Sequence, residues 1–373
     1  MKFSTSSSEL QKVLGNVAGV IPAKSTLPIL ENFLFEVSGD KLNISATDLD
    51  TSMSVSMKVR DGHDGKITVP AKRLSETVRT LPPIDLVFTA DTGNNKIIIR
   101  TANGEYKLTG ESSESYPSIP VFRGKEEMKI DNDTLRRLIG KTTFAVSSDE
   151  LRPAMMGILF QIKKGEIRAV ATDGHRLVRM INTSASVANQ NMERDIIVPA
   201  KALNLVMKSM NGADNMIAFS ESHAMFSSGG TTLVSRMIEE KYPSYETVIP
   251  LDNDKTMIIK KKDLLESVRR TALYASSTTH QVRFSLKKGS LTVSAEDIDF
   301  GSEAKETISC DYSSDPMEIG FNSSYIIDTL SQVDTDEAMI LFSSPTRASI
   351  IKPATQREGE NLLMLVMPVR LNA

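Results

Sequence analysis

This 373-residue chain repeats one set of sequence features three times, about 125 residues apart. The clearest feature is an acidic turn after a β-like run, marked by Asp48, Asp173 and Asp297. A fixed order at a fixed spacing indicates one unit that has been copied and fused. We therefore expect three domains of one fold. Their expected bounds are 1–125 for the N-terminal domain, 126–252 for the central domain and 253–373 for the C-terminal domain.

Two further stations recur in each unit. One is a short run before a second helix, which lies around Pro70, Pro199 and Phe321. The other closes the unit, as Tyr116-Pro117, Tyr242-Pro243 and Met367-Pro368. The shared order predicts that all three units use the same elements in the same sequence.

The first unit shows what those elements are. An apolar stripe from Leu10 to Val17 has helical spacing, and Ser6 with Glu9 forms a capping box at its start. Strand-like runs follow, such as residues 29–37, and a second helix is expected after Pro70. Each unit is therefore predicted to be α+β, with two helices packed on antiparallel sheets.

Composition excludes several classes of protein. Hydrophobic residues make up 40% and charged residues 24%, as in an ordinary globular protein. A single cysteine, Cys310, excludes an internal disulfide framework, and with an opening that has no apolar leader it predicts a cytoplasmic location. The four histidines are scattered, so we expect no metal and no cofactor. The absence of tryptophan disfavours base stacking on single strands.

Basic residues gather on the predicted helices, although the net charge is −3. They are Lys12, Lys72, Arg73, Arg79, Arg136, Arg137, Lys141, Lys201, Lys208, Lys260, Lys261, Lys262, Arg269 and Arg270. On a single helix such charge is explained by a solvated face. Six helices in one layer instead favour an electropositive surface that binds the phosphate backbone without reading sequence. A two-fold pair of three-unit arcs would close such a surface into a ring.

Two segments depart from the repeat. Asp173 and His175 suggest catalysis, but Asp48 and Asp297 share the station, which favours a turn residue. Only the central unit has Gly174 to Leu177 at this place. The apolar C-terminus from Leu365 is either a last core strand or part of a groove for partner peptides. We expect the two departures to meet.

Three motifs together, "TLPILENFLFEV", "ATDGHRL" and "VMPVRL", resemble the bacterial DNA polymerase III beta subunits, the sliding clamps, over almost the whole chain. The resemblance implies three tandem DNA-clamp domains in a head-to-tail homodimeric ring, with helices lining the pore. It implies a processivity factor that encircles duplex DNA and has no catalytic residues of its own.

The resemblance also implies a peptide groove between the second and third domains. Its residues would be Met155, Thr172, Gly174, His175, Arg176, Leu177, Pro243, Val248, Thr346, Ala348, Leu365, Val366, Met367, Pro368, Val369, Arg370 and Leu371. Met155, Thr247, Thr346 and Ala348 depart from the best-known pattern of the family. The expected occupants are the polymerase catalytic subunit, the clamp loader, repair polymerases, ligase and mismatch-repair proteins.

Two more surfaces are implied. The DNA-facing residues would be Lys24, Arg73 and Lys201, to which the basic helices add Arg136, Arg137 and Lys141. The subunit interface would join Leu273 and Tyr274 of one copy to Tyr106 and Leu108 of the other.

Two other functions stay open at this point. The Asp turns could serve a metal-dependent enzyme acting on nucleotides or sugars. The chain could also be a repeat scaffold without a role on DNA.

Overall fold

The structure, a computed structural model, describes residues 1–120, 122, 126–184, 192–210, 212 and 214–371. Its contacts divide the chain into two compact units. Unit 1 holds Met1–Arg136 and Val198–Met237, and unit 2 holds Arg137–Ile197 and the chain from Ile238 onward. The division passes through the central repeat. The predicted domain bounds stay a prediction.

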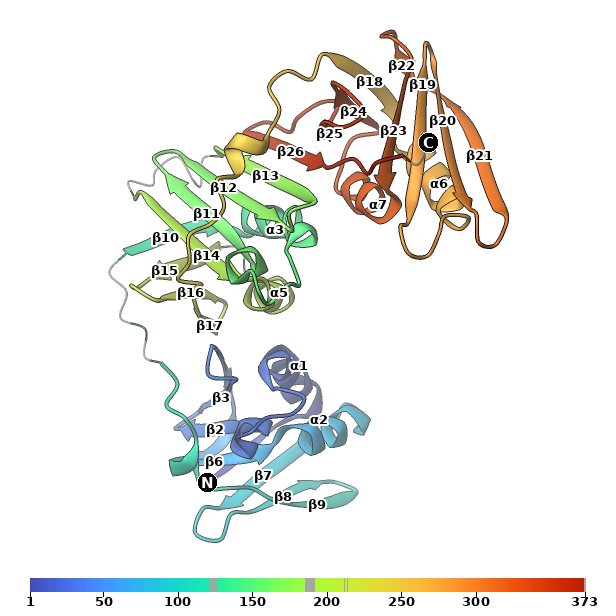
Figure 1. Ribbon diagram of the computed structural model, residues 1–373. Helices are drawn as coiled ribbons and strands as arrows, with labels where there is room; N and C mark the ends of the chain where they lie inside the picture. The colour runs from blue at the N-terminus through green and yellow to red at the C-terminus, as the bar shows by residue number, and fades with distance from the viewer. Residues whose placement is uncertain (121, 123–125, 185–191, 211, 213, 372–373) are drawn as a thin grey trace. The chain divides into compact units, whose positions relative to one another are not determined.

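The elements follow the same order in each repeat (Figure 1). The first repeat contains β1 (Lys2–Ser6), α1 (Ser7–Val17), β2 (Asn32–Ser38), β3 (Lys41–Thr47), β4 (Thr51–Lys58), β5 (Arg60–His63), β6 (Gly65–Pro70), α2 (Ala71–Thr80), β7 (Asp85–Asp91), β8 (Lys96–Thr101) and β9 (Gly104–Thr109). The second contains β10 (Glu126–Asp131), α3 (Asn132–Gly140), β11 (Gly157–Lys163), β12 (Glu166–Thr172), β13 (Arg176–Asn182), β14 (Arg194–Pro199), α5 (Ala200–Ser209), β15 (Asp214–Phe219), β16 (His223–Ser228) and β17 (Thr231–Arg236). The third contains β18 (Lys255–Lys260), α6 (Lys261–Ala272), β19 (Gln281–Lys287), β20 (Ser290–Asp297), β21 (Ser302–Ser309), β22 (Asp311–Tyr312), β23 (Met317–Asn322), α7 (Ser323–Ser331), β24 (Glu337–Phe342), β25 (Ser349–Pro353) and β26 (Glu360–Val366).

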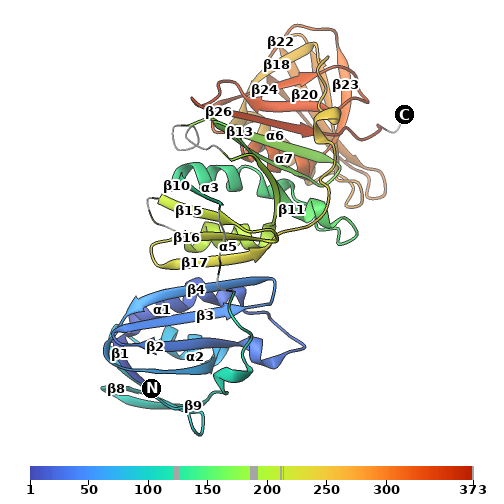
Figure 2. The ribbon, with the colours of Figure 1, turned by 90° about the vertical axis from the view of Figure 1, so that its left-hand side faces the viewer.

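Unit 1 contains two antiparallel sheets. The five-stranded sheet has the order β5-β1-β7-β8-β9, and the eight-stranded sheet has the order β10-β15-β16-β17-β4-β3-β2-β6. Figure 2 shows β2, β3 and β4 side by side in the second of these. Buried Phe3, Phe35 and Phe88 pack with ring centroids 4.8 to 6.3 Å apart and join the two sheets. Helix α1 packs against α2 and α5.

Unit 2 also contains two antiparallel sheets. Their orders are β14-β11-β12-β13-β26-β25-β24-β18-β22 and β21-β20-β19-β23. Helices α6 and α7 pack on each other, and buried Phe284 and Phe321 meet edge to face at 5.3 Å. The predicted α+β class, with helix pairs on antiparallel sheets, is confirmed. Within the described chain, no helix is both long and apolar enough to cross a membrane.

Local signals set the helix starts. The Ser6 side chain accepts a hydrogen bond of 3.1 Å from the Glu9 backbone N–H, as the predicted capping box requires. Helix α2 begins directly after Pro70, whose fixed φ suits a helix entry. The same arrangement recurs at Pro199 before α5.

The sequence predicts that Met367-Pro368 closes the third repeat in the way that Tyr116-Pro117 and Tyr242-Pro243 close the first two, and this prediction is wrong. Tyr116 and Tyr242 are buried, and their hydroxyls donate to the carbonyls of Asn32 (3.3 Å) and Val170 (3.4 Å). Met367 is 40% exposed and makes no such bond, because methionine has no hydroxyl to donate. It begins a separate tail instead.

The third acidic turn also differs from the other two. Thr47 pairs with Ser52, and Thr172 pairs with Leu177, which leaves four residues in each turn. In the third repeat Glu296 pairs with Glu303, so six residues separate the equivalent pair, and Asp297 with Ser302 forms one further pair before the turn. Ser302 therefore holds the place that Thr51 and Arg176 hold in the first two repeats.

Candidate functional site

The two segments that depart from the repeat meet in unit 2. Strand β13 pairs antiparallel with β26, so that Leu177 lies opposite Leu365 and Arg176 opposite Val366. Beyond the strand, the Met367 backbone N–H donates to the His175 carbonyl at 2.8 Å. The expectation that these segments meet is confirmed.

An apolar floor lies beneath this meeting point. Its buried residues come from the second and third repeats: Ala154, Leu159, Val170, Leu177, Ile197, Tyr242, Tyr245, Ile249, Ala348, Ile350 and Leu365. Burial raises the pKa of the Tyr242 hydroxyl, which therefore stays neutral at physiological pH. The floor is neutral and apolar.

The predicted groove residues fall into three groups by their exposure. Met155, Thr172, Leu177, Ala348, Leu365 and Val366 are buried. Gly174, His175, Pro243, Val248, Thr346, Met367 and Arg370 are exposed, whereas Arg176, Pro368, Val369 and Leu371 are half-buried. Val248 is 53% exposed beside this apolar floor. The exposed group could contact a ligand that the buried group supports from below.

The Asp173 side chain fixes the turn of residues 173–176, which forms one wall of the predicted groove. Its Oδ1 accepts the backbone N–H groups of His175 and Arg176, each at 2.9 Å. Oδ1 of Asp48 and of Asp297 accepts two backbone N–H groups in the same way. The prediction that Asp173 is a turn residue is confirmed.

Gly174 suits this turn for a conformational reason. Its φ is +90°, and Leu49 holds the same place in the first repeat with φ +82°. A non-glycine residue pays for the left-handed conformation, and glycine does not. The central repeat thus has a relaxed turn with no side chain at this point.

Arg176 ties the turn to the third repeat. Its guanidinium lies 4.8 Å from the Tyr325 ring and 5.3 Å from the Phe144 ring. It forms ion pairs with Asp173 (3.0 Å) and with Asp328 of α7 (2.6 Å). Its side chain is only 12% exposed, so Arg176 holds the wall in place more than it faces solvent.

Tyr325 completes the wall. Its ring stacks on His175 with centroids 5.9 Å apart. Burial raises the pKa of Tyr325, and the nearby Asp173 carboxylate raises it further. Sequence reasoning missed Tyr325, Phe144 and Asp328, because no local motif marks them. The one sequence signal for Tyr325 was its position in the repeat, at the start of the second helix of the third unit.

The C-terminal tail is fixed at a second point. The Val369 N–H donates to the Gly320 carbonyl of β23 at 2.9 Å. A Cβ placed on Gly320 would lie 2.8 Å from both the Val369 oxygen and a Leu371 methyl group. Only glycine therefore fits at position 320, and sequence reasoning missed this residue too.

Two predicted DNA contacts need correction. Arg137 forms ion pairs with Glu360 (2.6 Å) and Asp334 (2.8 Å). The hydrogen bond to Glu360 raises the Arg137 pKa, so this charge is permanent. Buried Lys141 pairs with Asp334 at 2.5 Å and also donates to the Gln332 carbonyl. Because both cations are already neutralised inside unit 2, we remove them from the predicted DNA-facing set.

The other predicted DNA contacts lie in unit 1. Lys24, Arg73 and Lys201 are exposed. Lys201 also forms an ion pair with Asp48, while 57% of its side chain remains exposed. Arg136 is half-buried and donates to the Met207 carbonyl at 2.7 Å. The role of these four residues in contacting DNA stays a prediction.

The predicted interface residues lie on both units. In unit 1, Tyr106 is 36% exposed and Leu108 half-buried, both on β9 at the edge of the five-stranded sheet. In unit 2, Leu273 is 82% and Tyr274 45% exposed just after α6. Such apolar exposure is costly unless a partner covers it.

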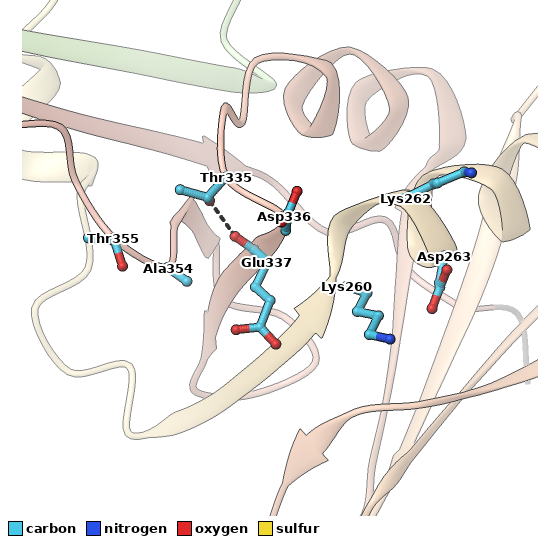
Figure 3. A pocket seen from close by; sticks show the side chains of 8 residues that line it. All are labelled: Lys260, Lys262, Asp263, Thr335, Asp336, Glu337, Ala354 and Thr355. Carbon is cyan, nitrogen blue, oxygen red and sulfur yellow. Dashed lines mark hydrogen bonds between the residues drawn. The ribbon is translucent and has the colours of Figure 1, made fainter.

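Unit 2 also has a cavity of about 620 Å³ near the start of α6 (Figure 3). Its lining is Lys260, Lys262, Asp263, Thr335, Asp336, Glu337, Ala354 and Thr355. Figure 3 shows lysines and carboxylates interspersed, with the Thr335 hydroxyl donating to the Glu337 carbonyl at 2.5 Å. It includes no predicted groove residue, and its acids offset the positive charge predicted there from sequence.

No cluster of three or more histidine, cysteine or acidic side chains suited to a metal ion was found among the residues that the structure describes. The carboxylates of Asp48, Asp173 and Asp297 accept hydrogen bonds from backbone N–H groups of their own turns. This bonding does not favour a metal-dependent enzyme that uses the Asp turns.

Comparison with known proteins points to one family. Three family profiles match consecutive parts of the chain, described as the N-terminal (residues 1–120), central (129–244) and C-terminal (246–370) domains of the DNA polymerase III beta subunit. The beta sliding clamp of Caulobacter vibrioides is 30% identical over 362 residues, which cover 94% of this chain and 95% of that protein. That of Pseudomonas aeruginosa is 29% identical over the full length of both.

Solved structures agree with these matches. A crystal structure of the Pseudomonas aeruginosa sliding clamp bound to griselimycin is similar to this chain with a TM-score of 0.92 at 28% identity, over the whole of both chains. The Caulobacter crescentus clamp gives 0.91 at 29%, covering 100% of this chain and 99% of that one.

Proposed function

Because the chain belongs to the DNA polymerase III beta subunit family, the beta sliding clamps, we propose that two copies close head to tail into a ring around duplex DNA. Family membership makes the chain a processivity factor and a non-catalytic subunit of the polymerase complex. A closed ring holds DNA by topology, so weak contacts do not resist sliding. We place it in the cytoplasm, where bacterial chromosomes are copied.

The observation that carries ring closure is a recurrent junction between repeats. Strand β4 pairs with β17 in unit 1, and β13 pairs with β26 in unit 2. The third pair of this kind would be β21 with β9, and both strands lie at sheet edges in the described chain. An open edge favours pairing with another chain. Leu273 and Tyr274 would then cover Tyr106 and Leu108 of the second copy.

Contact with DNA is assigned to Lys24, Arg73, Lys201 and Arg136. Exposed lysine and arginine side chains bind phosphates without reading bases, with dissociation constants on the order of 10⁻⁴ to 10⁻⁶ M at physiological salt. Such contacts weaken as salt rises. They would steady the duplex and permit movement along it.

The groove would hold short apolar peptides from the polymerase catalytic subunit and other partners. Its floor is neutral and apolar, and Val248 and Met367 stand exposed beside it. Methionine adapts its shape to different occupants, which suits a site shared by several proteins. We propose as partners the clamp loader, repair polymerases, ligase and mismatch-repair proteins.

Calorimetry tests the groove. Replacing Met367 and Leu371 together by alanine should weaken binding of a polymerase-derived peptide at least about tenfold, because two apolar contacts are lost. Leu251→Ala is the matched control, since Leu251 is 98% exposed and outside the groove. Unchanged peptide affinity in the double variant would refute the assignment.

Primer extension tests the function as a whole. On a primed circular single-stranded template, polymerase and clamp loader should extend much longer products per binding event when the chain is present. Products of equal length with and without it, at equal primer use, would contradict a processivity role.

A further inference from the structure

Met367 differs from every other methionine of the chain in its exposure. The chain has 18 methionines, and all of them lie in the part that the structure describes. Met367 is 40% exposed, whereas all the others are buried or half-buried. Peroxide oxidises a methionine thioether to a sulfoxide when it can reach the sulfur. We therefore expect peroxide to reach Met367 before the other methionines.

The one cysteine competes weakly for the same oxidant. The Cys310 thiol is half-buried, and its burial raises its pKa, which the neighbouring Asp311 carboxylate raises further. The thiolate is the reactive form of cysteine. Because Cys310 stays mainly protonated at neutral pH, it does not draw the oxidant away from Met367.

The fold does not require an apolar side chain at the position of Met367. The Met367 backbone N–H donates to the His175 carbonyl at 2.8 Å, directly after the strand pairing of β13 with β26 ends. At the corresponding point of unit 1, after the pairing of β4 with β17, the Arg236 N–H donates to the Asp50 carbonyl at 2.8 Å. Arg236 is exposed. A charged side chain is thus compatible with this backbone arrangement, and a polar, uncharged sulfoxide should be compatible too.

The apolar floor, in contrast, has no spare hydrogen-bond donor for a sulfoxide. Only Tyr242 and Tyr245 among the floor residues carry a donor on the side chain. The Tyr242 hydroxyl donates to the Val170 carbonyl at 3.4 Å, and the Tyr245 hydroxyl donates to Gln161 Oε1 at 2.6 Å. Water would satisfy the sulfoxide oxygen of exposed Met367. A peptide that covers the groove would remove this water, and a buried acceptor without a partner is unfavourable.

We propose that Met367 is an oxidation site, at which conversion to the sulfoxide weakens peptide binding and leaves the chain folded. The inference rests on the proposed groove and adds a means of regulating it. A bound peptide would cover the same sulfur. The empty groove is therefore the form that is oxidised, and an occupied groove is protected.

The chemistry balances with hydrogen peroxide as the oxidant. A lone pair on the Met367 sulfur attacks one peroxide oxygen, the O–O bond breaks and an S–O bond forms. The departing hydroxide takes up the proton of the transferred oxygen and leaves as water, so that the sulfur has lost two electrons to the peroxide. A methionine sulfoxide reductase reverses the step. Two thiols are then oxidised to a disulfide, and the oxygen leaves as water.

Peptide mapping by mass spectrometry tests the site in the full-length chain. With hydrogen peroxide, Met367 should form sulfoxide at least about tenfold faster than the half-buried Met57 and Met225 of unit 1. A saturating polymerase-derived peptide should slow the oxidation of Met367 and leave Met57 and Met225 unchanged. Oxidation of either reference methionine as fast as Met367 would overturn the site.

Calorimetry tests the effect on binding. After catalase has removed the peroxide, a methionine-free polymerase-derived peptide should bind the oxidised chain about tenfold more weakly than the reduced chain. Methionine sulfoxide reductase should restore the affinity. The Met367→Leu variant is compared with itself before and after peroxide, and its affinity should not change between the two. Unchanged affinity of a chain fully oxidised at Met367, or an equal loss in Met367→Leu, would overturn the proposal.

Two further measurements separate this proposal from others. The oxidised chain should keep the circular dichroism spectrum and the urea midpoint of the reduced chain, and a loss of either would overturn the claim that the fold tolerates the sulfoxide. A reduced chain that does not bind the peptide would overturn the groove itself. The oxidation rates of Met367 and its reference methionines would still decide whether Met367 is the oxidation site.

Discussion

Gly320 illustrates how one missing side chain can position a binding surface. The tail after β26 is held by two backbone bonds, from Met367 to His175 and from Val369 to Gly320. The second bond brings the tail so close to β23 that a methyl group has no room. The proposed groove therefore depends on Gly320, which has no side chain to contact a peptide.

Gly320→Ala should consequently weaken peptide binding. The added Cβ would displace Val369 and Leu371, at a cost of about 1–3 kcal/mol for overpacking. Calorimetry with a polymerase-derived peptide measures the effect. Gly15→Ala is the control, since no atom lies within 4 Å of its Cβ position. Equal peptide affinities in the two variants would show that the tail does not need this seat.

Some residues could be read from the sequence, because their role is local. Asp173 bonds to groups two and three positions ahead, within its own turn, so the repeat identifies it as a turn residue. Arg137 and Lys141 could not be read in this way. Their partners Asp334 and Glu360 are about 200 residues away, and charge alone does not show whether a cation faces DNA or a carboxylate.

At the scale of elements, the acids Asp334 and Glu360 connect α3 to the third repeat. Asp334 accepts hydrogen bonds from both Lys141 and Arg137. Its partial burial raises the Asp334 pKa, but the two cations outweigh burial, and the pKa is lowered overall. The carboxylate therefore stabilises the folded form at neutral pH and loses that effect as pH falls below about 4.

Asp334→Asn should lower the free energy of unfolding of unit 2 by about 1–2 kcal/mol at pH 7, because buried Lys141 loses its carboxylate. Urea unfolding measures this difference, which should shrink as the pH falls below about 4. Asp252→Asn removes a solvent-exposed pair with Arg347 and should change stability little. A difference that stays constant with pH would contradict the role given to Asp334.

Element order and helix starts follow from the repeat, since capping and periodicity are local. The junctions between repeats do not, because the partners of edge strands are set by three-dimensional contacts. The third acidic turn is an example: only the strand pairing shows that two extra residues separate its equivalent pair, and that Ser302 is the equivalent of Thr51 and Arg176. The sequence also does not show that the chain continues as a separate tail beyond Val366, because the end of β26 is set by strand pairing.

At the scale of the whole molecule, the central proposal is that two copies close into a ring. Ring formation would use the same strand pairing that joins the repeats within each unit, and the apolar Leu273 would lie at its centre. Leu273→Asp should therefore convert the dimer to single chains, because a buried unpaired charge is costly. Sedimentation measures this change, and a variant that remains dimeric would place the interface elsewhere.

Retention on DNA tests closure most directly. The clamp is loaded onto a nicked circular plasmid by the clamp loader, separated from free protein by gel filtration, and the plasmid is then cut at one site. A closed clamp should stay with the circle and leave the linear DNA within minutes, and the Leu273→Asp variant should not be retained at all. Equal retention on circular and linear DNA would contradict a ring that holds DNA by topology.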